Sequence, residues 1–179
     1  MQTQIKPAAA LTAKEVDLVA ALNQQVFGQA NADYVWATAD WHVLLWVGNE
    51  DDASEVDNLV GHIEIVVRTC TVDDYPVRVG GIGKVATAPN WRGRGLASAA
   101  LQRAQVFIAE VLGLEFCLLV CSEAQAPFFK ALSWNATTGP LWFSQPGGRV
   151  QLKGVTTMVR SCSGRPFPSG SIDLCGLPW

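Results

Sequence analysis

Apolar residues recur at helical spacing in some segments of the chain and form short continuous runs typical of strands in others. Each change between the two patterns marks the boundary of a predicted element. Apolar residues recur at helical intervals after Thr12-Ala13-Lys14-Glu15, whose spacing of Thr and Glu is typical of a helix capping box. This pattern predicts a first helix at about 12–27 that ends at Gly28. A second stripe of apolar and small residues predicts an uninterrupted helix at about 93–112.

Strands are predicted where β-branched and apolar residues form runs bounded by turn residues. The run at 59–72 is followed by Asp73-Asp74-Tyr75-Pro76, a turn that would return the chain antiparallel into 77–87. Glycines at 80, 81 and 83 of the second strand indicate a bulge or the close approach of another group. The other predicted elements are strands at 3–8, 41–47, 115–121, 140–144 and 155–160, a short helical or irregular segment at 31–40, and a short helix at 126–131.

The last stretch of the sequence, 162–179, combines Ser, Gly and Pro with a few large apolar residues. Ile172, Leu174, Leu177 and Trp179 would be costly to leave in water, so we expect this tail to pack on the rest of the chain. No repeat or linker interrupts the pattern. We therefore expect one domain at 1–179, with 162–179 as a C-terminal tail docked on it.

Composition and charge narrow the classes of function. The 179 residues include 13 basic and 16 acidic ones, and a net charge of −3 gives no general attraction to nucleic acid or to an anionic membrane. No apolar run approaches the roughly 20 residues needed to span a bilayer, and the N-terminus lacks the features of a secretory signal. The 5 cysteines are widely spread, and His42 and His62 lie far apart in sequence, so no metal-binding spacing is present. We expect a cytoplasmic protein with reduced thiols and no metal.

One segment has the composition of an anion-binding loop. Arg92-Gly93-Arg94-Gly95-Leu96-Ala97 lies between a predicted strand and the second long helix. Glycines let backbone N–H groups approach an anion, the start of a helix is electropositive, and guanidinium groups bind phosphate oxygens in pairs. The segment therefore predicts a pyrophosphate-binding loop, and an arginine-rich turn capping a surface helix is the alternative.

This loop fits the pattern Arg/Gln-x-x-Gly-x-Gly/Ala, and with the order of elements the chain resembles the GCN5-related N-acetyltransferase (GNAT) superfamily over about 12–160. Pro127-Phe128-Phe129-Lys130-Ala131-Leu132-Ser133-Trp134 is similar to the family's Phe-Tyr-x-x-x-Gly-Phe/Trp segment. The end of the chain, 172–179, resembles members near the aminoglycoside 2′-N-acetyltransferases and the nodulation acyltransferases. The resemblance implies an α/β (α+β) GNAT fold, with a mixed, mostly antiparallel central sheet, helices on both faces and a splay between strands 4 and 5.

The resemblance also implies a co-substrate and the residues that bind it. Acetyl-CoA would lie in the splay, with no metal, and backbone groups of Val85, Ala86 and Thr87 would pair with its pantetheine arm. The pyrophosphate would be held by Arg92, Gly93, Arg94, Gly95, Leu96, Ala97 and Ser98. A backbone N–H would stabilise the oxyanion as a neutral primary amine of a small molecule attacks the thioester directly.

Two residues that relatives use for proton transfer are missing at the matching positions. Gly80-Gly81-Ile82-Gly83-Lys84 carries no carboxylate, and Phe129 stands where many relatives have Tyr. Glu64 shares a strand face with His62, and an acid among apolar neighbours has a raised pKa suited to a general base; a solvated strand face is the alternative. The other candidates are Glu123, which would otherwise be an acid at a helix start, and then His62, Cys121 and the carboxylate of Trp179.

The missing residues keep two other functions open. One is an acyl-CoA-binding module with little turnover, and the other is an acyltransferase that uses a longer acyl chain. Lys84 would disfavour a strongly cationic acceptor if it faces the cleft. We expect a small-molecule amine as partner, without nucleic acid or membrane, and leave the oligomeric state open, with a homodimer as one option.

Overall fold

The computed structural model describes residues 1–28, 34–48 and 58–179. Its described strands form one ten-stranded sheet in which the neighbours are antiparallel, except that β5 runs parallel to β4 and β10 parallel to β7. The strands are β1 (Gln2–Pro7), β2 (Trp41–Val47), β3 (Asn58–Val72), β4 (Tyr75–Thr87), β5 (Phe116–Cys121), β6 (Asn135–Ala136), β7 (Leu141–Gln145), β8 (Gly148–Leu152), β9 (Thr156–Ser161) and β10 (Ile172–Asp173).

The long strand β3 organises this sheet. One of its edges pairs with β4, and the other pairs first with β2 and then, near its end, with β10. β1 pairs with β2, while β5, β9 and β6 extend the sheet beyond β4, and β7 and β8 extend it beyond β10. The predicted mixed, mostly antiparallel sheet is confirmed.

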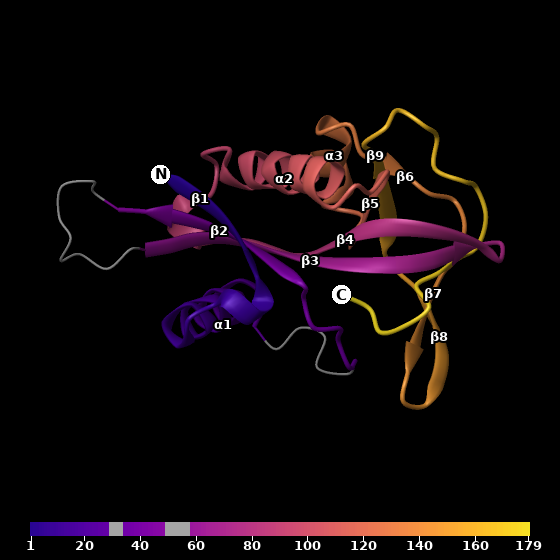
Figure 1. Ribbon diagram of the computed structural model, residues 1–179, viewed down its shortest axis with the longest axis horizontal. Helices are drawn as coiled ribbons and strands as arrows, with labels where there is room; N and C mark the ends of the chain where they lie inside the picture. Colours follow the sequence, from indigo (N-terminus) through magenta and orange to yellow (C-terminus); the bar gives the residue numbers. More distant parts are fainter. Residues whose placement is uncertain (29–33, 49–57) are drawn as a thin grey trace.

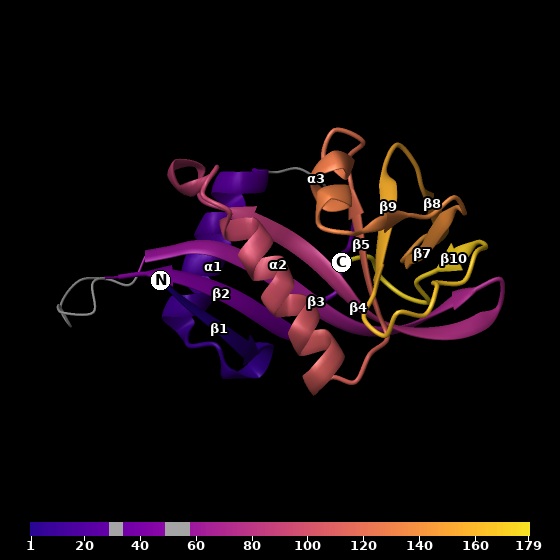
Figure 2. The same ribbon diagram turned by 90° about the horizontal axis from the view of Figure 1, so that it is seen from above.

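Helices cover both faces of the sheet. Figure 1 shows α1 (Ala13–Phe27) below the sheet and α2 (Leu96–Val106) and α3 (Ala126–Ala131) above it, and Figure 2 shows α2 crossing the strands. Two short 3-10 turns occupy Ala8–Ala10 and Pro89–Trp91. Within the described part of the chain, no helix has the length and apolar character that a bilayer span requires.

The capping box at the start of α1 is present as predicted. The Glu15 backbone N–H donates to Thr12 Oγ1 over 3.2 Å, and the Thr12 backbone N–H donates to Glu15 Oε2 over 2.8 Å. These two bonds satisfy backbone donors that a helix leaves unpaired at its first turn. The sequence therefore fixes where α1 begins, and Gly28, with a φ of 58°, follows its last residue.

The predicted uninterrupted helix at 93–112 is wrong at both ends. α2 begins only at Leu96, because Gly93 and Gly95 have φ values of 73° and 75°, outside the helical region. At its other end, Phe107–Val111 forms a wider π-helical turn, in which Leu112 N–H donates to Phe107 O over 3.1 Å. Ile108 in this turn packs against β4 at Gly80, where an added Cβ would lie 2.7 Å from its side chain.

The tail packs into the fold and contributes a strand that was not predicted. β10 lies between β3 and β7, and Ile172 and Leu174 are fully buried in a cluster with β3, β5 and β7. β6 and β8 were also not predicted, since they are very short or rich in polar residues. The predicted segment at 31–40 lies partly outside the described residues, and 34–40 contains no helix.

Candidate active site

Strands β4 and β5 separate at the centre of the sheet. They pair only from Val79 with Phe116 to Ile82 with Leu119; beyond that point β4 continues beside β3, and β5 continues beside β9. The register of β3 against β4 shifts between His62 and Glu64, and Lys84 has a φ of 49°. This bulge turns β4 away from β5, so its edge from Gly83 onward is unpaired on that side. The predicted splay is confirmed.

A cavity of about 720 Å³ opens at this separation. Its floor is the bulged part of β4 with the end of β5, and its walls come from α1, α3, the segment before β2 and the tail. The aromatic residues that line it are Phe27, Tyr34, Trp36, Phe129 and Trp179. The cavity therefore joins elements that are far apart in the sequence, next to an open strand edge.

Trp179 closes one side of this cavity by packing on β4. A Cβ added to Gly81 would lie 2.1 Å from the Trp179 indole, and one added to Gly83 would lie 3.1 Å from its carbonyl carbon. The glycines predicted to mark a close approach therefore do so. The guanidinium of Arg68 lies 5.8 Å from the centre of the indole, within the range of a cation–π contact.

The predicted anion-binding loop joins the open edge of β4 to α2. No heavy atom would lie within 4 Å of a Cβ added to Gly93 or Gly95, so the backbone there is accessible. In contrast to α1, α2 has no side-chain cap, which leaves the N–H groups of its first turn without side-chain partners. The arginines are exposed and anchored by the loop: Arg92 Nε donates to Thr87 O over 3.3 Å, and the Arg94 guanidinium lies 4.6 Å from the centre of the Trp91 ring.

A buried polar chain runs from the sheet to the cavity. Asn23 of α1 lines the cavity, and its Oδ1 lies 3.2 Å from His62 Nδ1; His62 Nε2 in turn lies 2.8 Å from His42 Nδ1. An amide oxygen only accepts, so His62 Nδ1 carries the proton and donates it. In a neutral ring His62 Nε2 then accepts, and His42 Nδ1 is the donor. With the Asn23 oxygen facing His62, the donors of this chain therefore run from His42 through His62 to Asn23.

Burial keeps both imidazoles neutral. It lowers the pKa of His62 to about 3, with the charges of His42 and Lys84 acting in the same direction, and it also lowers the pKa of His42. Ligand atoms of His42, His62 and Glu64 lie within 4.8 Å of one another, close enough for a cation to bridge. The coordinating nitrogens of two imidazoles on one tetrahedral zinc would lie about 3.3 Å apart. The 2.8 Å distance between His42 Nδ1 and His62 Nε2 is shorter and is that of a hydrogen bond.

Glu64 lies beside this chain, on the same face of β3 as His62. Burial raises the pKa of Glu64, and the positive charge of Lys84 opposes that effect. Lys84 lines the cavity and is half-buried. Glu64 is thus an acid with a raised pKa next to the cavity floor, as the sequence predicts, although its side chain does not line the cavity itself.

The remaining candidates fall into two groups. Cys121, Phe129 and Trp179 line the cavity, whereas Glu123 is exposed and is not among its lining residues. Burial raises the pKa of the Cys121 thiol, which makes it a poor nucleophile at neutral pH. Sequence reasoning did not identify Asn23 and Tyr34 as cavity-lining residues, because no local motif marks them.

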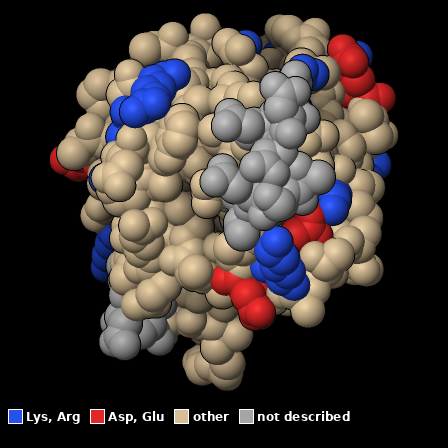
Figure 3. Space-filling model, turned by 90° about the vertical axis from the view of Figure 1, so that its left-hand side faces the viewer, with Lys and Arg blue, Asp and Glu red and all other residues tan. Residues whose placement is uncertain are grey.

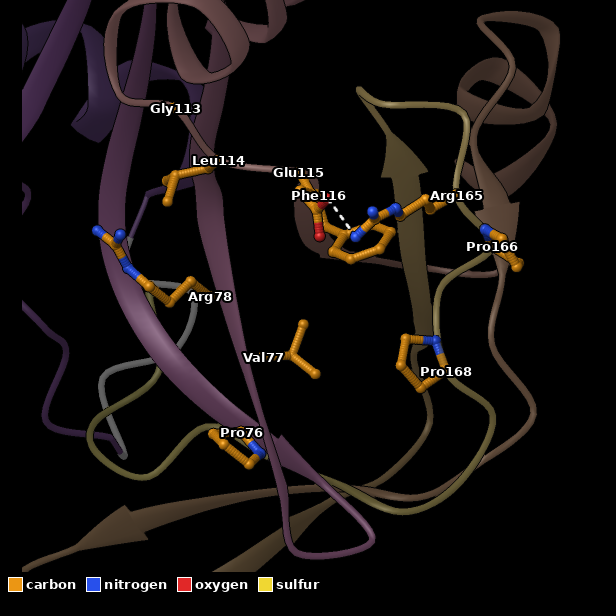
Figure 4. Close-up of a pocket in the computed structure, with 10 residues that line it drawn as sticks. All are labelled: Pro76, Val77, Arg78, Gly113, Leu114, Glu115, Phe116, Arg165, Pro166 and Pro168. Atoms are coloured by element: carbon orange, nitrogen blue, oxygen red, sulfur yellow. Dashed lines mark ion pairs between the residues drawn. The ribbon is translucent and has the colours of Figure 1, made fainter.

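A second cavity, of about 490 Å³, lies at the opposite end of the paired part of β4 and β5. Figure 4 shows Arg165 reaching toward Glu115, with which it forms an ion pair over 3.1 Å. The other lining residues are mainly apolar or proline. Figure 3 shows basic and acidic side chains scattered over one face of the molecule among uncharged residues.

Comparison with known families shows which family this chain belongs to. Residues 8–135 match the family model described as an acetyltransferase (GNAT) domain. The chain belongs to the GNAT acetyltransferase family. No curated protein matches this GNAT protein. Its likeness to the aminoglycoside and nodulation enzymes stays a prediction.

Solved structures share the fold of this GNAT protein. An acyl-CoA N-acyltransferase from Pseudomonas aeruginosa has a TM-score of 0.61 at 20% identity, over 89% of this chain and 98% of that one. The GNAT family N-acetyltransferase YhbS from Escherichia coli, in complex with CoA, has a TM-score of 0.61 at 12% identity, over 98% of this chain and 91% of that one. The ribosomal-protein-S18-alanine N-acetyltransferase from Escherichia coli has a TM-score of 0.55 at 13% identity, over 92% of this chain and 97% of that one. Family membership assigns N-acyltransferase chemistry, and the CoA in the YhbS structure is a ligand of that protein.

Proposed function

We propose that this GNAT protein is an acetyl-CoA-dependent N-acetyltransferase that acts on the primary amine of a small molecule. The observation that carries the proposal is the open edge of β4, which leads from the 720 Å³ cavity at one end to the uncapped start of α2 at the other. A CoA thioester requires a site at each end of this edge: an anion site for its pyrophosphate and an enclosed space for its acyl group.

We propose for these residues the binding roles that the family resemblance implies. Backbone groups of Val85, Ala86 and Thr87 would pair with the pantetheine arm as a neighbouring strand does. The pyrophosphate would be held by Arg92, Gly93, Arg94, Gly95, Leu96, Ala97 and Ser98. Because Arg92 and Arg94 already contact Thr87 O and Trp91, their side chains lose less conformational freedom when they bind an anion.

The reaction requires the protein mainly to orient the thioester and the amine and to transfer protons. Acetyl-CoA supplies a thioester whose C–S bond breaks as the amine nitrogen forms a C–N bond to the carbonyl carbon. A backbone N–H on the open edge of β4 would stabilise the oxyanion that develops. Glu64, whose pKa is raised by burial, lies beside His62 on β3, and we propose it as the general base.

The direct test is release of free thiol from acetyl-CoA in the presence of a panel of primary amines, with the amide product confirmed by mass spectrometry. Thioesters with longer acyl chains, assayed in parallel, test the acyl group. Tight CoA binding without thiol release for any amine would contradict the proposal. That result would instead support an acyl-CoA-binding module, which the missing Tyr at Phe129 and the missing acid on β4 favour.

A further inference from the structure

Two cysteines meet where the tail leaves the sheet. Cys117 lies on β5 opposite Arg160 of β9. Cys162 lies one residue beyond β9, and its backbone N–H donates to Glu115 O over 2.7 Å. Alternate residues along a strand share a face of the sheet, so Arg160 and Cys162 lie on the same face as Cys117. The sulfurs of the two cysteines are 3.6 Å apart, within the range of a thiol hydrogen bond.

The two thiols have different surroundings. Cys117 is fully buried, whereas Cys162 is half-buried and precedes an exposed stretch at 163–166. The hydrogen bond from the Cys117 thiol and the positive charge of Arg160 lower the pKa of Cys162 to about 7, although its partial burial acts in the opposite direction. Donating that hydrogen bond, together with burial, raises the pKa of Cys117. The pair therefore consists of a partly ionised thiol that solvent reaches and a protonated thiol behind it.

The charged side chains around the pair favour an anion at Cys162. The guanidinium of Arg160 is held in place because it donates to Leu132 O. The carboxylate of Glu115, whose backbone pairs with Cys162, forms an ion pair with Arg165 over 3.1 Å. The cation beside the sulfur is thus fixed, and the charge of the neighbouring acid is compensated.

We propose that Cys162 is a site of oxidation by peroxides and that Cys117 converts the oxidised form to a disulfide. The Cys162 thiolate attacks one oxygen of hydrogen peroxide, the O–O bond breaks, and a sulfenic acid forms as hydroxide leaves. The Cys117 thiol then gives up its proton as its sulfur attacks the Cys162 sulfur. An S–S bond forms, the S–O bond breaks, and water leaves. The two thiols are oxidised, and the peroxide is reduced.

The fold allows this cross-link and gives it a consequence. The sulfurs must approach from 3.6 Å to about 2 Å, and Cys162 can supply the movement because it lies beyond the end of β9, whereas Cys117 is held within the sheet. The chain between the two cysteines includes α3 and the cavity-lining residues Phe129, Leu141 and Val155. The disulfide would therefore restrain one side of the cavity. The inference goes beyond the proposed function and does not depend on acyl transfer.

Peptide mapping without reduction tests the inference directly. The wild type is treated with hydrogen peroxide at pH 7, the remaining thiols are alkylated, and mass spectrometry with fragmentation assigns the linked sulfurs. We expect a disulfide between Cys117 and Cys162 as the main product. Cys175→Ser, which removes an exposed thiol outside the pair, should leave this product unchanged, and Cys162→Ser should abolish it. A main product that joins other cysteines, or oxidation of Cys175 while this pair stays reduced, would overturn the inference.

Cys117→Ala separates the roles of the two sulfurs. Without a second thiol the sulfenic acid should persist, so dimedone should label Cys162 in the variant and not in the wild type. The pH midpoint for alkylation of Cys162 should also rise from about 7 toward the roughly 8.5 of a free cysteine, because the hydrogen bond from Cys117 is lost. Circular dichroism checks that the variant is folded. An unchanged midpoint, or no dimedone adduct at Cys162, would contradict the assignment.

Discussion

The indole of Trp179 lies so close to Gly81 that a Cβ added to that glycine would be 2.1 Å from the ring. This contact fixes the tail beside the open edge of β4 and closes one wall of the cavity. The Pro178 carbonyl strengthens it by accepting from the Ala37 N–H over 2.7 Å. The shape of the cavity therefore depends on a contact between two residues that are nearly a hundred positions apart along the chain.

The first prediction concerns this contact. Gly81→Ala should displace Trp179 and destabilise the fold by about 1–3 kcal/mol, the usual cost of overpacking a buried site. Urea unfolding followed by tryptophan fluorescence measures the change. Gly147→Ala is the matched control, because nothing lies within 4 Å of a Cβ there. An equal effect of the two substitutions would show that the Trp179 contact is not the cause of the loss of stability.

The arginines of the loop give a second prediction. Arg92→Ala and Arg94→Ala should each weaken CoA binding by about tenfold, since each removes a charge-assisted contact to a phosphate. Isothermal titration calorimetry measures the affinity. Arg103→Ala, on the exposed side of α2, removes the same charge outside the loop and should have little effect. Unchanged affinity in both loop variants would refute the assignment of the pyrophosphate site.

A third prediction follows from the raised pKa of Glu64. Glu64→Gln should lower kcat by about 10²–10⁴ if the carboxylate is the general base, with CoA affinity unchanged. The wild-type rate should rise as pH increases through the raised pKa, because only the ionised form accepts a proton. Ionising a group whose folded pKa is raised lowers stability above that pKa, so the variant should be at least as stable as the wild type at neutral pH. Loss of activity accompanied by loss of stability would point to a structural role instead.

The buried His62 predicts how stability responds to acid. The pKa of His62 is lowered to about 3 in the folded protein and is about 6.5 when unfolded, so the unfolded chain binds more protons between these values. Stability should therefore fall as pH decreases below 6.5, by about 2 kcal/mol between pH 7.5 and pH 5 from this residue alone. Denaturant unfolding at the two pH values measures it. His62→Gln should remove that part of the loss, and an unchanged pH dependence would contradict the assignment.

Local signals in the sequence predict local structure well here. The capping box places the start of α1 because the residues that form it are three positions apart, and β2 is predicted to the residue because its apolar run is broken only by His42. The end of α2 was not predictable in this way. Its π-helical turn places Ile108 against Gly80, a contact between segments that only the folded sheet brings together.

The same distinction applies to the site. The loop follows from a motif, and the unpaired edge of β4 was expected from the family resemblance. The hydrogen bond between His42 and His62 depends on the register of β2 against β3, which the sequence does not show, and Asn23 joins them only because α1 packs on that face. Glu123 was predicted from its position after β5, yet the chain turns so that its side chain is exposed.

The central claim is that this GNAT protein transfers an acetyl group from CoA to an amine beside the β4 bulge. It is tested most directly by incubating the wild type and Glu64→Gln with acetyl-CoA and a panel of primary amines, while thiol release and amide formation are followed together. We predict equal amounts of free thiol and amide for at least one amine with the wild type, and a strong reduction of both with Glu64→Gln. Tight binding of CoA by both proteins with no amide formed from any amine would contradict it.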